Sequence, residues 1–268
     1  MTAIPTAAPA APDPTAGFRM PADLPYPQTP PYTPGQYGPW RLHTKFEETR
    51  ELGYFTGLDV EPVGHYLVKD GWTWMSTSRL ELESHAVHLK HARGTVVVCG
   101  VGMAMFLYNV ACSPRVDRVI AVDLDRSVMD LAQHATGFDD WPGRRKVSFV
   151  HRDATTLTPE DVGGPVDFLY VDIWPELGDP AAIPQTQAIQ AAVKATTVGW
   201  WGQEVDFVQW CFEHRPAGHV PTVDDYVAFG QAVGLPIAEA TEAFVRACRQ
   251  AGEVFKRYGS HPFAVAGR

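Results

Sequence analysis

This sequence contains few cysteines and no long apolar runs. The four cysteines, Cys99, Cys112, Cys211 and Cys248, form no C-x-x-C pair and no spacing typical of a metal site. We therefore expect no metal and free structural thiols in a reducing compartment. No stretch reaches the ~18 apolar residues of a membrane-spanning helix, and the first residues lack the basic and apolar segments of a secretory signal. These absences predict a cytoplasmic protein with no membrane partner.

Basic residues are also in the minority. The chain has 22 Lys and Arg against 31 Asp and Glu, which gives a formal net charge of −9. The densest basic cluster, Arg144-Arg145-Lys146, is typical of a solvated turn before a strand. Because nucleic-acid binding depends on positive charge, we expect no nucleic-acid partner.

Composition divides the chain into three parts. Residues 1–38 are rich in Pro and Ala, which excludes helix and central strand and predicts either a disordered tail or an ordered arm. Residues 39–93 contain a hairpin at 66–75, whose turn Asp70-Gly71 supplies positive φ angles. A largely polar run then predicts a surface helix at 80–89. Residues 94–268 carry the remaining strands and a helical tail.

The clearest motif begins at residue 95. A β-branched run at 95–99 predicts a buried parallel strand. It ends at Gly100-Val101-Gly102, where missing side chains let the backbone turn sharply beside a ligand. A second buried strand at 119–122 delivers Asp123, with Leu124 beside it, at the distance typical of a ribose ligand. The motif predicts a site for a nucleoside cofactor.

Strands and helices alternate after Gly102. We expect strands at 146–150, 166–172 and 197–201, and helices at 103–111, 127–135, 184–194 and over most of 222–258. This alternation predicts an α/β fold with a doubly wound, mostly parallel, Rossmann-like sheet.

Two cofactor classes combine a glycine turn with an acid on the next strand: dinucleotides and S-adenosylmethionine. A dinucleotide site needs a third glycine, where this chain has Met105. Asp153 and Ala154 follow the third strand, where an acid accepts the adenine amino hydrogen. Asp172 ends the fourth strand, where it faces the reacting group. This arrangement favours S-adenosylmethionine.

Over roughly residues 60–205 the chain resembles the class I S-adenosylmethionine-dependent methyltransferases, in their spermidine-synthase-like branch. The resemblance rests on the hairpin at 66–76, the following helix with His85, and the run Val-Val-Val-Cys-Gly-Val-Gly. It implies a seven-stranded sheet with the adenosyl ligand across the strand tips. It also implies these cofactor contacts: Gly100 and Gly102 along the cofactor, Asp123 at the ribose, Asp153 with Ala154 at the adenine, and Asp172 at the transferred group.

The chain departs from the family at the positions of several acids. Methyltransferases carry an acid just before the first glycine, where this chain has Val98 and Cys99. Polyamine synthases carry an Asp after the glycines, here Met103, and an Asp-x-x-Asp pair that Asp172 does not complete. A diamine acceptor needs several carboxylates, so these departures weaken polyamine synthesis more than methyl transfer.

Asp172 is the candidate base or acceptor-orienting group. Trp174 follows it, and Trp200 and Trp201 come after the fifth strand, where aromatic faces stabilise a cation. His85 is a candidate for proton transfer, although a lone helical His is more often structural. Gln203 and Glu204 are candidates for acceptor binding, with an ordinary surface position as the alternative.

The sequence therefore favours an S-adenosylmethionine-dependent methyltransferase with a small-molecule acceptor, with a homodimer as one arrangement. An aminopropyltransferase acting on an amine is one alternative. The other is a protein that binds an adenosyl ligand without transferring methyl, such as a lyase or a regulatory module. Fold by itself does not set function.

Overall fold

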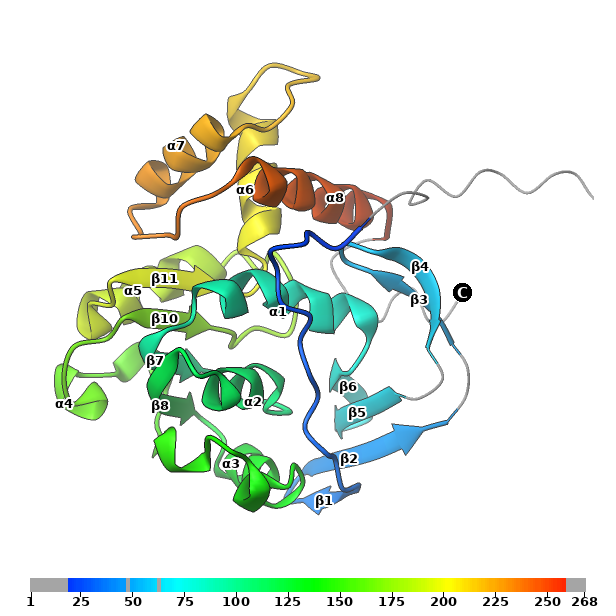
Figure 1. The fold of residues 1–268 in the computed structure, drawn as a ribbon, viewed down its shortest axis with the longest axis vertical. Helices are drawn as coiled ribbons and strands as arrows, with labels where there is room; N and C mark the ends of the chain where they lie inside the picture. Colours follow the sequence, from blue (N-terminus) through cyan, green and yellow to red (C-terminus); the bar gives the residue numbers. More distant parts are fainter. Residues whose placement is uncertain (1–18, 47–48, 62–63, 259–268) are drawn as a thin grey trace, which may run out of the picture.

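A computed structural model describes residues 19–46, 49–61 and 64–258. Its centre is a five-stranded sheet in the order β11-β10-β7-β8-β9, with every neighbouring pair parallel (Figure 1). The strands are β7 (Gly94–Cys99), β8 (Val116–Asp123), β9 (Val147–His151), β10 (Phe168–Val171) and β11 (Thr197–Trp200). The predicted doubly wound α/β sheet is confirmed.

The resemblance implied a sheet of seven strands, but the parallel sheet of the described residues has five strands. Ile237 adds only an isolated parallel bridge to Val198 of β11. After β11 the chain enters α6 (Gln203–His214), which buries Phe207 and Cys211. Helices α7 (Val223–Val233) and α8 (Glu242–Tyr258) follow. In Figure 1 these three helices gather at one end of the molecule.

Helices cover both faces of the parallel sheet. From β7 the chain adds β8 and then β9 toward one edge of the sheet, and it then adds β10 and β11 toward the other edge. Right-handed crossovers therefore place α2 (Met105–Cys112) and α3 (Arg126–His134) on one face and α5 (Ala182–Val193) on the other. The short connecting elements are η1 (Phe138–Asp140), η2 (Arg144–Lys146), η3 (Ala154–Thr156) and α4 (Pro159–Val162).

An antiparallel sheet precedes the parallel one, in the order β1-β2-β5-β6. The predicted hairpin is confirmed as β5 (Gly64–Lys69) and β6 (Trp72–Ser76), with Asp70 and Gly71 at φ 53° and 81°. The other strands were not predicted: β1 (Gly35–Tyr37), β2 (Trp40–Lys45), and a separate pair, β3 (Thr49–Gly53) with β4 (Gly57–Glu61).

Helix α1 (Arg79–His91) is buried, and the prediction of a surface helix was wrong. Every residue from 80 to 89 is buried inside the protein. Several polar side chains of α1 have partners inside the protein: Glu83 accepts from the N–H of Phe55 at 2.6 Å, and Ser84 accepts from the Trp201 indole at 2.8 Å. Polarity predicted exposure, but internal partners permit burial.

Residues 19–34 run along the folded body, as the blue segment in Figure 1 shows. The contacts join distant parts of the chain: Asp23 to Lys90, the Gln28 N–H to Asn109 Oδ1 at 2.9 Å, Tyr32 Oη to the Met103 carbonyl at 2.9 Å, and the Thr33 N–H to the Ala135 carbonyl at 2.7 Å.

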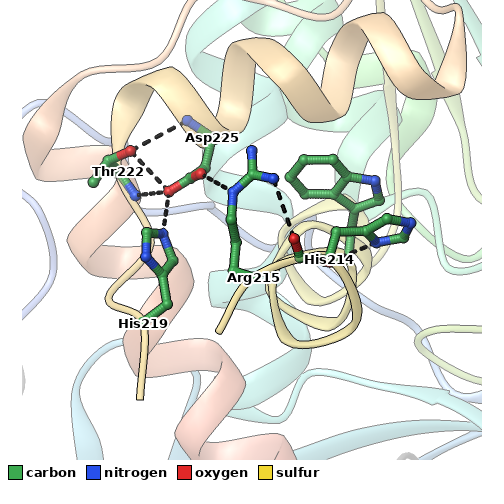
Figure 2. A network of polar contacts seen from close by, with 6 residues as sticks. His214, Arg215, His219, Thr222 and Asp225 are labelled. Carbon is green, nitrogen blue, oxygen red and sulfur yellow. Dashed lines mark hydrogen bonds and ion pairs between the residues drawn. The ribbon is translucent and has the colours of Figure 1, made fainter. Parts of the chain in front are cut away.

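A polar network closes the loop between α6 and α7 (Figure 2). Asp225 accepts from Arg215 Nε and His219 Nε2, both at 2.6 Å, and from the Thr222 N–H at 2.9 Å. Burial opposes ionisation, but the bonds from His219, Arg215 and Thr222 outweigh it and hold the pKa of Asp225 well below its usual value. The network thus secures the start of α7. Within the described part of the chain, no helix is both long and apolar enough to cross a membrane.

Candidate active site

A cavity of about 660 Å³ opens at the carboxyl ends of the parallel strands. This is where open α/β sheets bind ligands. The residues predicted as cofactor contacts all line it, and so does Trp174: Gly100, Gly102, Asp123, Leu124, Asp153, Ala154 and Asp172.

The glycine turn forms one wall of the pocket. Gly100 has φ +91°, and a Cβ there would lie 1.7 Å from the backbone oxygen of Asp172. A Cβ on Gly102 would lie 2.1 Å from the sulfur of Met75. The clash with backbone requires glycine at position 100, where β7 turns beside β10, whereas at Gly102 the flexible Met75 side chain would have to move.

Asp123 braces this turn from the end of β8. Its Oδ2 accepts from the Val101 N–H and its Oδ1 from the Asp125 N–H, both at 2.8 Å. Burial raises the pKa of the Asp123 carboxyl, although these backbone bonds oppose the rise. The side chain holds the loop and also faces the pocket.

Residues after β8 and β9 form the adjoining side. Leu124 is 69% exposed yet lines the pocket, so its apolar face is available to a flat ligand. Asp153 accepts from the Thr155 N–H at 2.9 Å and caps η3, which fixes the turn that carries the buried Ala154.

Asp172 stands at the end of β10, opposite the glycine turn. Burial raises the pKa of its carboxyl to about 8, and the charge of Asp123 adds to the rise. This carboxyl is therefore largely protonated at neutral pH in the free protein. A cation in the pocket favours its ionised form.

Two tryptophans border the same end of the pocket. Trp174 donates from Nε1 to Gln185 at 2.7 Å, and Trp201 donates to Ser84. Trp200 points to the other side, where it donates to Asp206 at 2.7 Å and packs near Phe229. Successive residues at a strand end face opposite ways, so the tryptophan pair is divided.

His85 does not line the pocket. It is buried, its Nδ1 lies 2.9 Å from Tyr170 Oη, and its ring packs against Phe106. Burial, with the nearby His88, lowers the pKa of His85 to about 3. It is therefore neutral at physiological pH and separated from the cavity.

Gln203 and Glu204 also lie away from the cavity, buried in the first turn of α6. Gln203 donates to Tyr226 Oη at 2.5 Å, and Glu204 accepts from Tyr54 Oη at 2.5 Å. His88 Nε2 lies 3.7 Å from Glu204. The two side chains thus connect α6 to its neighbours rather than reaching the pocket.

Sequence reasoning missed the wall contributed by the antiparallel sheet and α1. This wall consists of Trp40, Leu67, Lys69, Trp74, Met75 and Glu81. Trp40 donates to Asp125 at 2.7 Å, and Lys69 Nζ lies 4.7 Å from the centre of the Trp40 ring. No spacing along the chain predicts these contacts. The aromatic residues of the hairpin were a signal in the sequence, but they did not indicate which wall they would form.

Acidic side chains dominate the pocket. Five line it: Glu81, Asp123, Asp125, Asp153 and Asp172. The basic residues in the lining each face an acid: Lys69 lies 3.8 Å from Asp125, Arg126 3.3 Å from Asp130, and Arg152 3.1 Å from Asp161. The cavity suits a ligand that carries positive charge. Across the described residues, no group of three His, Cys, Asp or Glu side chains is placed to hold a metal ion.

Comparisons with known proteins found relatives of two kinds, solved structures with a similar fold and a curated protein of similar sequence. No family model matches the chain. The solved structures with related folds include a spermidine synthase from Thermotoga maritima, 14% identical, covering 63% of this chain and 54% of that one, with a TM-score of 0.36. The likeness concerns the fold: the parallel sheet of the described residues is the Rossmann-like α/β sheet that the sequence predicted.

A curated relative is more specific. Polyamine aminopropyltransferase 2 from Caldanaerobacter subterraneus subsp. tengcongensis is 30% identical over 133 residues, which cover 46% of this chain. The match spans 43% of that relative's length. The relatives are thus transferases of the methyl or aminopropyl type.

The expectation that excluded nucleic acid is wrong. An rRNA methylase from Streptococcus thermophilus is among the related folds, 15% identical, covering 50% of this chain and 79% of that one, with a TM-score of 0.34. Net charge is a sum over the whole chain, and it does not describe the pocket, whose lining includes Lys69, Arg126 and Arg152. No acceptor is assigned to this chain from that structure.

Proposed function

We propose that this chain is a transferase that binds an adenosyl sulfonium, and that the group it transfers is methyl from S-adenosylmethionine. The observation that carries the proposal is one cavity that combines a glycine turn, acids at the carboxyl ends of β8, β9 and β10 and a predominantly acidic lining. A sulfonium is a cation, which this lining complements.

The residues present fit the adenosyl group. Asp123 would accept from the ribose hydroxyls, and Leu124 with Ala154 would border the adenine beside Asp153. The glycine turn, which lines the cavity at Gly100 and Gly102, would lie along the chain that joins ribose to sulfur. S-adenosylmethionine supplies an electrophilic methyl group on a positively charged sulfur.

Asp172 and the tryptophans would serve the acceptor. Methyl transfer forms a bond from the acceptor atom to carbon as the carbon–sulfur bond breaks, and the acceptor then loses a proton. Asp172, ionised beside a cation, can take that proton or orient the acceptor. Trp174 and Trp201 exclude water and present aromatic faces to positive charge.

Aminopropyl transfer is the second candidate, favoured by the curated relative. This chain lacks acids at two positions where polyamine synthases carry them, which argues against aminopropyl transfer. Met103 replaces one acid and its side chain is buried, while Pro175 stands three residues after Asp172 and is exposed. Methyl transfer needs neither acid.

The first test is titration calorimetry with S-adenosylhomocysteine, and with NAD as a control. We expect micromolar binding to the wild type, at least tenfold weaker binding to Asp123→Ala, and none of NAD. Because Asp123 also braces the glycine turn, a 3′-deoxy analogue tests the ribose contact without changing the protein. It is expected to bind the wild type more weakly than its parent.

Preference for NAD, or no binding of S-adenosylhomocysteine, would reject the proposal. Turnover is then measured with S-adenosylmethionine and with its decarboxylated form, each with small amines and with RNA as acceptors. Turnover with the first indicates methyl transfer, and turnover with the second indicates aminopropyl transfer.

A further inference from the structure

The chain lacks the acids with which related enzymes hold the amino group of the cofactor tail. Val98 and Cys99, just before the first glycine, are fully buried in β7, and the Met103 side chain is fully buried as well. None of these three side chains lines the pocket. An ammonium group at the glycine turn therefore needs a partner from another element.

The direction of the tail follows from the sheet. Asp123 and Asp153 place the nucleoside over β8 and β9, so the tail runs past β7 toward β10. Two acids line the pocket on that side, Asp172 and Glu81. Asp172 follows β10, where it faces the transferred group.

Glu81 reaches the pocket from a different layer. It lies in the first turn of α1, is 2% exposed, and shares the lining with Gly102 and Met75. Its Oε2 accepts from the Ser76 N–H at 2.7 Å and from Ser76 Oγ at 3.1 Å. Met75, the residue before Ser76, covers Gly102, and its sulfur lies 3.3 Å from the Met103 nitrogen.

Two features of the surroundings stabilise negative charge at position 81. Hydrogen bonds from Ser76 stabilise a carboxylate, and the first turn of a helix favours negative charge. A carboxylate in a pocket wall attracts an ammonium group that enters the pocket, because the surrounding protein screens the two charges less than water does.

We propose that Glu81 binds the ammonium group of the cofactor tail, in place of the acids missing at positions 98, 99 and 103. This inference rests on the proposed adenosyl site and adds the residue that recognises the tail. It predicts that the amino group of the ligand contributes to affinity through Glu81.

The test compares three neutral-sulfur ligands by calorimetry. S-adenosylhomocysteine carries ammonium and carboxylate, its decarboxylated form carries ammonium alone, and 5′-methylthioadenosine carries neither. With Glu81→Gln we expect at least tenfold weaker binding of the first two ligands and less than twofold change for 5′-methylthioadenosine. The glutamine amide oxygen still accepts from Ser76, so the local structure is retained.

Glu83→Gln is the matched control on the same helix. Glu83 is buried and bonds to Phe55 and Thr56, but it does not line the pocket. The control is expected to leave the affinity ratio among the three ligands unchanged. If Glu81→Gln does not fold, Glu81→Asp, which keeps the charge but shortens the reach, is expected to weaken the two ammonium ligands selectively.

Equal weakening of all three ligands, or no change in any, would overturn the assignment of Glu81. If the wild type binds 5′-methylthioadenosine while this discrimination is absent, the adenosyl site stands and only Glu81 fails. If the wild type binds none of the three ligands, the proposed function fails and the assignment with it.

Discussion

Asp172 combines a position at the tip of β10 with a carboxyl that holds its proton in the free protein. Its pKa of about 8 comes from burial and from the charge of Asp123. A carboxyl in this state responds strongly to a cation, because the cation lowers the free energy of the ionised form. The protonation state of Asp172 should therefore report on what enters the pocket.

We expect S-adenosylmethionine to release protons from Asp172 when it binds at pH 7, and its affinity to rise from pH 6 to pH 8. Linkage limits this rise to about tenfold per pH unit. Calorimetry in buffers of different ionisation enthalpy measures the release. Asp172→Asn should abolish it. Equal proton release by the wild type and the variant would contradict this role.

At the scale of the element, the entry to α2 carries an unusual backbone. Ala104, the residue before α2, has φ 62° and ψ 20°, and it is fully buried. A left-handed residue with a Cβ costs about 1–2 kcal/mol. The buried methyl of Ala104 offsets part of this cost by about 0.8 kcal/mol.

Ala104→Gly should therefore leave the free energy of unfolding within about 0.5 kcal/mol of the wild type, because relief of strain offsets the lost methyl and the greater chain entropy. Ala132→Gly is the control. Ala132 is also fully buried, but it lies inside α3, where the same change should cost at least about 1 kcal/mol. Urea unfolding measures both, and equal losses would refute the strain at Ala104.

The whole molecule contains a buried polar layer, with α1 at its centre, between the parallel sheet and the antiparallel strands. His85 lies in this layer with a pKa of about 3, far below that of an exposed histidine. The unfolded chain takes up a proton near pH 6.5, whereas the folded chain does not. Acid therefore favours the unfolded state.

We expect the free energy of unfolding to fall as the pH drops from 6.5 toward 3, with His85 contributing up to about 1.4 kcal/mol per pH unit. His85→Gln, which does not titrate, should flatten this slope. Urea unfolding at several pH values measures it. A slope that is the same in both proteins would show that His85 is not buried in its neutral form.

What could be predicted from the sequence is local in origin. β-Branched runs mark buried strands, glycines mark the turn, and acids directly after three strands must meet at one sheet edge, because parallel strands share their direction. These patterns were sufficient for the sheet, for the hairpin turn at Asp70-Gly71 and for the residues that line one side of the cavity.

Tertiary structure decided the rest, because packing partners distant in the chain are not encoded in any spacing. Burial of α1 depends on Phe55, Tyr170 and Trp201 to satisfy its polar side chains. The placement of Glu81 in the pocket wall depends on the antiparallel sheet packing beside the glycine turn. The sequence by itself determined the five parallel strands, the hairpin and the acids that follow the strands, because these patterns are local; only the packing of the two sheets decided which charges face one another across the cavity.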